Sequence, residues 1–145
     1  MYKNILIPTD GSELSGKAIQ HGVALAKALN AKVTAVTVSK PFHVFAIEPG
    51  MVTDTPESYA KRAAETAAKH LGAVKGAAAG AAVACDAIRV EHEHPYKAII
   101  DTAKNRGCDA IVMASHGRHG VSAIVLGSET VKVLTHSTIP VLVYR

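Results

Sequence analysis

The segment AIVMASHGRHGVSAIVLGS, residues 110–128, joins a short apolar run to a connection that contains glycine. Its first five residues form an uninterrupted apolar stretch, which is typical of a strand buried on both faces. The glycines that follow let the backbone turn and approach another group closely. The pair Gly127–Ser128 has the character of a helix N-terminus. The segment therefore predicts a buried strand, a loop over residues 115–128 and a helix over residues 128–136.

The same alternation of strand and helix runs through the whole chain. Apolar or β-branched runs predict strands at residues 5–7, 32–38, 83–91 and 140–144. Apolar residues at helical spacing and helix-start signals at Ser12, Pro56 and Pro95 predict helices over residues 12–29, 56 to 72 or 76, and 95–107. Strands that alternate with helices predict one α/β domain, residues 1–145, with a doubly wound parallel sheet covered on both faces.

The turn after the first strand and the loop after the fourth are candidates for one binding crevice. In open parallel sheets, ligands bind beyond the carboxyl ends of the strands, where the strand order reverses. Asp10 follows the first strand and Ala114 ends the fourth, so neighbouring strands would bring these ends together. A helix that begins at Gly127–Ser128 presents unpaired N–H groups and a positive dipole, which favour an anion. Arg118 in the loop is a candidate for a charge-assisted bond to a terminal phosphate.

Composition narrows the classes of partner. The chain has 145 residues, and only 4% are aromatic, with no Trp, so it lacks the aromatic platforms of a surface that binds single-stranded nucleic acid. The net charge is +4, and the basic residues are scattered. No apolar run approaches the roughly 18 residues of a membrane span. The two cysteines form no CxxC pair, so a reducing, cytoplasmic location is expected.

Three separated motifs carry a resemblance to a known family. Gly117, nine residues and then Gly127–Ser128 resemble the nucleotide loop of the universal stress protein family, whose ATP-binding members have the pattern Gly-x-x-Gly-x9-Gly-Ser/Thr. Residues 3–12 resemble the family's first strand and turn, and residues 140–144 resemble its last strand. The chain departs from the pattern at the first glycine, where Ala114 stands. A Cβ at that position occupies space beside a phosphate or ribose and disfavours a positive φ.

The resemblance implies a fold and a ligand. The fold is a five-stranded sheet in the order 3-2-1-4-5, similar to the adenine nucleotide alpha hydrolases. The implied ligand is ATP, or ADP or AMP, with Mg²⁺ as an accompanying ion. The implied partner is a second copy of the chain, which forms a homodimer through the C-terminal strand. The implied role is that of a cytoplasmic stress-response protein.

The implied site residues fall into groups along the nucleotide. Pro8, Thr9 and Asp10 would face the adenine or ribose, and Val38 would contact the adenine. Ala114 and Gly117 would border the ribose and phosphates, and His116 and Arg118 are candidates for contacts with the phosphates. Met113, the residue before Ala114, is counted with the same nucleotide-binding site. Gly127, Ser128, Glu129 and Thr130 would meet the phosphates, mainly through backbone N–H groups and hydroxyls. The Glu129 side chain is expected to point to solvent.

Other functions stay open at the level of the sequence. Ser115, His116, His119 and Ser122 show no spacing that defines a catalytic triad, so no catalytic residue is assigned. The resemblance leaves room for slow ATP hydrolysis or self-phosphorylation. An interaction module that has lost the nucleotide is the other alternative, and Ala114 favours it. His92 and His94 are candidates for a metal pair, although a surface pair of histidines is the simpler interpretation.

Overall fold

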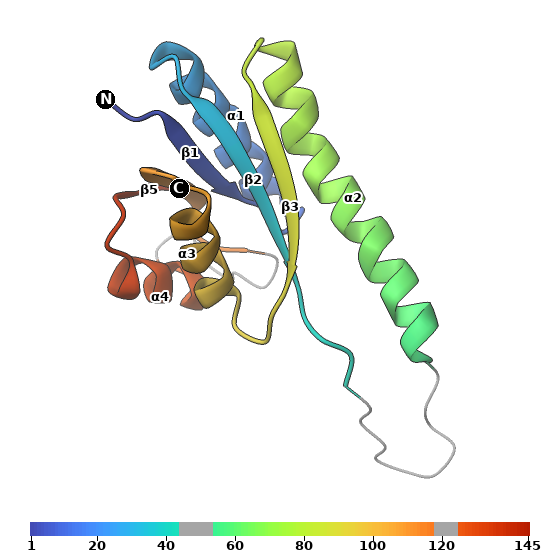
Figure 1. Cartoon of the computed structure of the whole chain (residues 1–145). Helices are drawn as coiled ribbons and strands as arrows, with labels where there is room; N and C mark the ends of the chain where they lie inside the picture. The colour runs from blue at the N-terminus through green and yellow to red at the C-terminus, as the bar shows by residue number, and fades with distance from the viewer. Residues whose placement is uncertain (44–53, 118–124) are drawn as a thin grey trace.

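The structure is a computed structural model that describes residues 1–43, 54–117 and 125–145. Its strands form one five-stranded parallel sheet in the order β3-β2-β1-β4-β5 (Figure 1). The elements in chain order are β1 Asn4–Pro8, α1 Glu13–Ala28, β2 Lys32–Ser39, α2 Pro56–Gly80, β3 Cys85–Glu91, α3 Pro95–Asn105, β4 Ala110–Ala114, α4 Ser128–His136 and β5 Val141–Tyr144. The predicted alternation of elements and the predicted strand order are both confirmed.

Helices cover both faces of the sheet in pairs. Ile5 and Ile7 of β1 share one core cluster with apolar residues of α1 and α2. Leu6, which points to the opposite face, belongs to a second cluster with residues of α3 and α4. All three side chains are 0% exposed, so the central strand is buried on both sides (Figure 1). This burial explains why β1 reads as an apolar run without alternation.

Helix α2 continues to Gly80 and is therefore longer than the predicted end at Gly72 or Gly76. The buried side chains Ala67, His70, Val74 and Ala78 form a stripe along the whole C-terminal half of the helix. Both glycines lie on open sides of the helix, where a Cβ would meet nothing. The surrounding alanines favour the helix more than the two glycines oppose it. The N-terminal half of α2 extends past the carboxyl ends of the strands (Figure 1).

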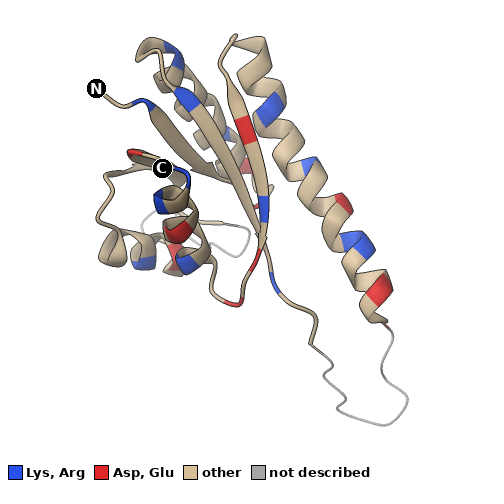
Figure 2. Cartoon of the chain, viewed as in Figure 1, with Lys and Arg blue, Asp and Glu red and all other residues tan. Residues whose placement is uncertain are grey.

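The charged residues form no single patch in the described part of the chain. Lys and Arg positions are spread over the helices and the strand ends, with Asp and Glu positions between them (Figure 2). This distribution agrees with the scattered charges in the sequence. Among the helices described, none is long and apolar enough to cross a membrane.

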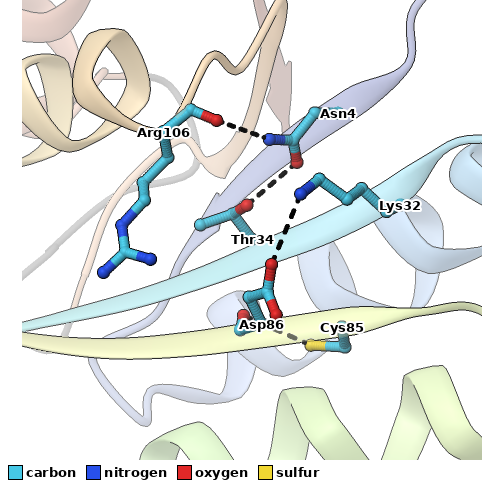
Figure 3. A network of polar contacts seen from close by, with 6 residues as sticks. All are labelled: Asn4, Lys32, Thr34, Cys85, Asp86 and Arg106. Carbon is cyan, nitrogen blue, oxygen red and sulfur yellow. Dashed lines mark hydrogen bonds and ion pairs between the residues drawn. The ribbon is translucent and has the colours of Figure 1, made fainter.

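Side-chain hydrogen bonds close the amino-terminal edge of the sheet (Figure 3). The buried Asn4 side chain accepts a bond of 2.9 Å from the Thr34 hydroxyl and donates one of 3.0 Å to the Arg106 carbonyl. These bonds join β1 to β2 and to the turn that precedes β4. The backbone N–H of Asn4 donates to Asp109, 3.1 Å away. Among the described residues, no buried side-chain nitrogen or oxygen lacks a hydrogen-bond partner, so the polar contacts at this edge are satisfied.

Two glycines of α1 differ in what their side chains would meet, and they give a test of the packing. A Cβ on Gly22 would lie 2.6 Å from Cδ1 of the buried Ile7, whereas one on Gly16 would meet nothing within 4 Å. We expect Gly22→Ala to lower the free energy of unfolding by about 1–3 kcal/mol through overpacking. Gly16→Ala should raise it by about 0.5–1 kcal/mol, because alanine favours the helix. Urea denaturation of both variants measures these changes, and equal effects would contradict the close packing of α1 on β1.

Candidate functional site

A cleft of about 760 Å³ opens at the carboxyl ends of β1, β2 and β4. Residues of α2, of α3 and of the start of α4, with one residue of α1, form its other walls. Every described residue of the site predicted from the resemblance lines this cleft, whereas Arg118 lies outside the described residues, as do His119 and Ser122. The residues that the fold brings together are Pro8, Thr9, Asp10, Val38, Met113, Ala114, His116, Gly117, Gly127, Ser128, Glu129 and Thr130.

The turn after β1 places the Asp10 carboxylate beside the loop after β4. Oδ1 of Asp10 accepts a bond of 3.0 Å from the N–H of Ser12. Gly11 has a φ of +77°, which favours glycine. A Cβ on Gly117 would overlap Oδ2 of Asp10. Gly117 therefore leaves room for the Asp10 carboxylate in its present position, and it is not one of the glycines with positive φ.

The loop after β4 returns to the end of its own strand before α4 begins. The N–H of Gly127 donates to the Ser115 carbonyl at 2.7 Å. A Cβ on Gly127 would lie 3.0 Å from the Cα of His116, so this contact of backbone on backbone also requires glycine. The Thr130 hydroxyl donates to the Ala114 carbonyl at 3.0 Å. These contacts fix the first turn of α4 directly beyond the end of β4.

The first turn of α4 is suited to an anion. Gly127 is the N-cap residue, and no side chain among the described residues caps the helix. The Ser128 hydroxyl does not cap α4, because Ser128 is already the first helical residue. The leading N–H groups of a helix have no partners within the helix and carry the positive end of its dipole. They can therefore donate to phosphate or carboxylate oxygens.

The expectation that the Glu129 side chain points to solvent is wrong, because its carboxylate bonds to α3 and to a lysine. Its Oε2 accepts a bond of 2.8 Å from the N–H of Tyr96, in the first turn of α3. Its Oε1 lies 3.3 Å from Nζ of Lys132. The bond forms because the N-cap of α3, His94, provides no side-chain acceptor and the next residue is Pro95. The negative charge of Glu129 is thus offset by the dipole of α3 and by a lysine, which leaves α4 free to attract an anion.

Ala114 fits its position as the last residue of β4. Its backbone is extended and pairs with Tyr144 of β5, so the position requires no positive φ. The objection that alanine disfavours a positive φ at the first motif position therefore does not apply. The Cβ still borders the cleft, where it takes up part of the space beside the loop.

The wall of the cleft that α2 contributes was not predicted from the sequence. Residues of one face of this helix line the cleft, together with Lys40 at the exit from β2. The buried His70 lies against the turn after β1, since a Cβ on Gly11 would overlap its ring. The signal was the helical spacing of Tyr59, Arg62, Ala63, Thr66, Ala67 and His70. That spacing identifies a face of the helix, but only the fold shows that this face borders a cleft.

The histidine pair after β3 shows no sign of a metal centre. The rings of His92 and His94 have their centroids 5.9 Å apart, and the Nδ1 of His92 accepts a bond from the N–H of His94. The described ranges contain no group of three or more His, Cys, Asp or Glu side chains that could hold a metal ion.

The two cysteines lie away from the cleft, at the amino-terminal edge of the sheet. Cys85 begins β3, and the buried Cys108 precedes β4. Burial raises the pKa of both thiols above the ordinary cysteine value, with smaller contributions from neighbouring charges. Neither residue is therefore placed or activated as a nucleophile for the cleft.

The raised pKa values predict slow thiol chemistry. Because the thiolate is the reactive form, a disulfide reagent at pH 7 should label both cysteines more slowly than free cysteine. Above the ordinary cysteine pKa of about 8.5, the labelling rate of free cysteine levels off, whereas the labelling rate of these two thiols should continue to rise with pH. Labelling of the wild type and of Cys85→Ser, followed by absorbance between pH 7 and 10, separates the two thiols. Rapid labelling of either one at pH 7 would contradict the raised pKa.

The contact between Gly117 and Asp10 can also be tested directly. We expect Gly117→Ala to displace the Asp10 carboxylate, because the new Cβ overlaps one of its oxygens. The bond from Ser12 N–H to Oδ1 should weaken, which would shift the Ser12 amide resonance and speed its hydrogen exchange. Gly16→Ala, whose Cβ meets nothing, is the matched control. A Ser12 amide that behaves alike in both variants would show that the carboxylate does not depend on Gly117.

Comparison with known proteins places the chain in a family. The family model described as the universal stress protein family matches residues 1–145. Universal stress protein MJ0531 of Methanocaldococcus jannaschii is 32% identical over 147 residues, which cover 100% of this chain and 83% of that protein. Universal stress protein YxiE of Bacillus subtilis is 31% identical over 149 residues, which cover 100% of both chains. The chain belongs to the universal stress protein family.

Solved structures agree with the fold. The structure of MJ0577 has a TM-score of 0.82 at 30% identity and covers 99% of this chain and 96% of its own. A universal stress protein in complex with cAMP has a TM-score of 0.73 at 23% identity, covering 99% and 97%. One from Archaeoglobus fulgidus in complex with dAMP has a TM-score of 0.66 at 18% identity, covering 99% and 98%. The identities of the last two are low, so these two likenesses show a shared fold.

Proposed function

We propose that this chain is a stress-response protein that binds ATP, or a related adenine nucleotide such as ADP or AMP, in the cleft between the ends of β1 and β4. The observation that carries the proposal is the convergence of the motif residues. Asp10 lies more than a hundred residues before Gly117 and Gly127, and all three line one cleft. Its volume of about 760 Å³ falls within the range of about 300–1,000 Å³ that is usual for small-molecule sites.

The chemistry of the cleft supports a nucleotide in one orientation. The first turn of α4 offers N–H groups and the Ser128 hydroxyl to phosphate oxygens. The Asp10 carboxylate suits ribose hydroxyls as an acceptor. Val38, at the end of β2, supplies apolar surface to a base. Mg²⁺ that accompanies the nucleotide would be held mainly by phosphate oxygens and water, as is usual for this ion.

The ligands of structural neighbours support the same class of molecule. The universal stress proteins bound to cAMP and to dAMP both carry adenine nucleotides and share this fold. They support an adenine nucleotide in general. The preference for ATP over these monophosphates rests on the resemblance of the loop to the ATP-binding pattern.

We also propose a homodimer through β5 and a cytoplasmic location. β5 pairs only with β4 in the described sheet, and its Leu142 side chain is 49% exposed. An exposed apolar edge strand favours pairing with another chain.

The free cysteines are consistent with a reducing compartment. The proposed role is binding rather than dedicated catalysis, and slow ATP hydrolysis is an outcome that the following experiment detects.

Calorimetric titration tests the proposal. Purified protein is titrated with ATP, ADP, AMP and cAMP in the presence of Mg²⁺, and we expect at least one to bind. Ser128→Ala should weaken binding by about three- to tenfold through the loss of one hydrogen bond. Gly127→Val should weaken it by more than about tenfold, since its side chain meets backbone within the loop. Gly16→Ala, which is remote from the cleft, should bind like the wild type.

Each contrary result has a defined meaning. The absence of binding to all four nucleotides would contradict the proposal and favour an interaction module. Undiminished binding by Gly127→Val would show that the phosphates lie elsewhere. Multiple turnover of ATP in the same samples would identify an enzyme.

A further inference from the structure

Two buried hydroxyl groups hold the turn that carries Asp10. The Thr37 hydroxyl of β2 donates a bond of 2.8 Å to the carbonyl of Thr9. The Ser15 hydroxyl of α1 donates a bond of 2.7 Å to the Oγ1 of Thr9. This same oxygen accepts from the N–H of Gly11 at 3.3 Å. Thr9 is therefore fixed through its carbonyl and through its side chain, by two different elements.

These two donors have almost no surface to offer to a ligand. Thr37 and Ser15 are each 3% exposed, although both lie at the wall of the cleft. Their effect on a bound molecule must pass through Thr9 and the residues that follow it. Asp10 comes next in the chain, and its carboxylate lies against Gly117. A turn that is fixed before the ligand arrives loses less conformational entropy on binding.

We propose that Thr37 is a positioning residue of the nucleotide site, which acts by holding Thr9 so that Asp10 faces the ligand beside Gly117. Ser15 supports the same turn from the side of α1. The proposal rests on the proposed function, since the affinity that it explains is affinity for a nucleotide. Neither hydroxyl belongs to the motifs that carry the family resemblance.

The same strand provides a matched control. Thr34 is also a threonine of β2, is 1% exposed, and donates its hydroxyl to an acceptor on β1, the Asn4 side chain, at 2.9 Å (Figure 3). It lies at the amino-terminal edge of the sheet and does not line the cleft. Replacement of either threonine by valine leaves a buried acceptor without that donor: the Asn4 side chain of β1 for Thr34, and the Thr9 carbonyl after the end of β1 for Thr37. Only at Thr37 does the acceptor belong to the turn that carries Asp10.

Affinity for ATP and for AMP, each with Mg²⁺, is measured by calorimetry for Thr37→Val, Thr37→Ser and Thr34→Val. We expect Thr37→Val to weaken binding by about tenfold, the effect of one hydrogen bond of about 1.4 kcal/mol. Thr37→Ser keeps the hydroxyl and should stay within about twofold of the wild type, as should Thr34→Val, which should nevertheless lower the melting temperature. Equal losses of affinity in the two valine variants, or in Thr37→Ser and Thr37→Val, would overturn the proposal.

A double-mutant cycle tests the route through Asp10. In an Asp10→Asn background, Thr37→Val should weaken binding much less than in the wild type, because the group that it positions is already altered. If the two changes multiply, Thr37 acts independently of Asp10 and the proposal fails.

Amide exchange of the ligand-free protein separates this inference from the proposed function. Thr37→Val should speed hydrogen exchange at Gly11 and Ser12, whose N–H groups bond within the turn, and Thr34→Val should not. A wild type that binds neither nucleotide would contradict the proposed function. Unchanged exchange at Gly11 and Ser12 would overturn the positioning role, whatever the nucleotide results.

Discussion

The burial of β1 on both faces is the constraint on which the rest of the structure depends. Ile5, Leu6 and Ile7 must each be covered, so helices have to pack on both sides of the sheet. The chain leaves β1 toward the face of α1, whereas it leaves the neighbouring β4 toward the face of α4. The connection from β1 to α1 and the connection from β4 to α4 run to opposite faces of the sheet. Neither connection therefore covers the carboxyl ends of these two adjacent strands. The cleft is a geometric consequence of covering the central strand.

The divergence also determines which chemical groups meet in the cleft. The turn after β1 brings a carboxylate, and the loop after β4 brings the positive end of a helix. These would attract each other across the cleft if nothing else held them. Asp10 bonds within its own turn, and Glu129, the acid nearest to the start of α4, is engaged by α3 and Lys132. The dipole of α4 is therefore not satisfied by Glu129 and can act on an anion from outside.

The sequence predicted those parts of the molecule that depend on local pattern. Apolar runs located all five strands, and glycine and proline marked most of their ends. The strand order followed from the resemblance, because periodicity carries no information on which strands are neighbours. The end of α2 was missed because glycines at 72 and 76 stop a helix only when the packing stripe also stops, and here it continues to Ala78.

The site was predictable where it depends on motifs and hidden where it depends on contacts at long range. Asp10, Gly117 and Gly127 were identified, and they do lie together on one cleft. The bond of Glu129 to Tyr96 joins residues 33 apart, and nothing local in either segment indicates it. Gly117 was predicted as a glycine of the loop, but its contact with Asp10 was not predicted. Its lack of a Cβ gives room to an aspartate that lies more than a hundred positions earlier in the chain, rather than to a turn.

The two ends of the β1–β2 pair show how one kind of bond can serve two purposes. At both ends a buried threonine of β2 donates to an acceptor in the segment of β1 and its following turn. At the amino-terminal edge that acceptor is the Asn4 side chain, which is part of a closed network, so the bond contributes to the stability of the sheet. At the carboxyl edge the acceptor is the backbone of the turn that carries Asp10, so the same bond also fixes part of the cleft. Under the proposed function, stability and binding would depend on opposite ends of one strand pair, and because the two bonds share no atoms, each can change while the other is kept.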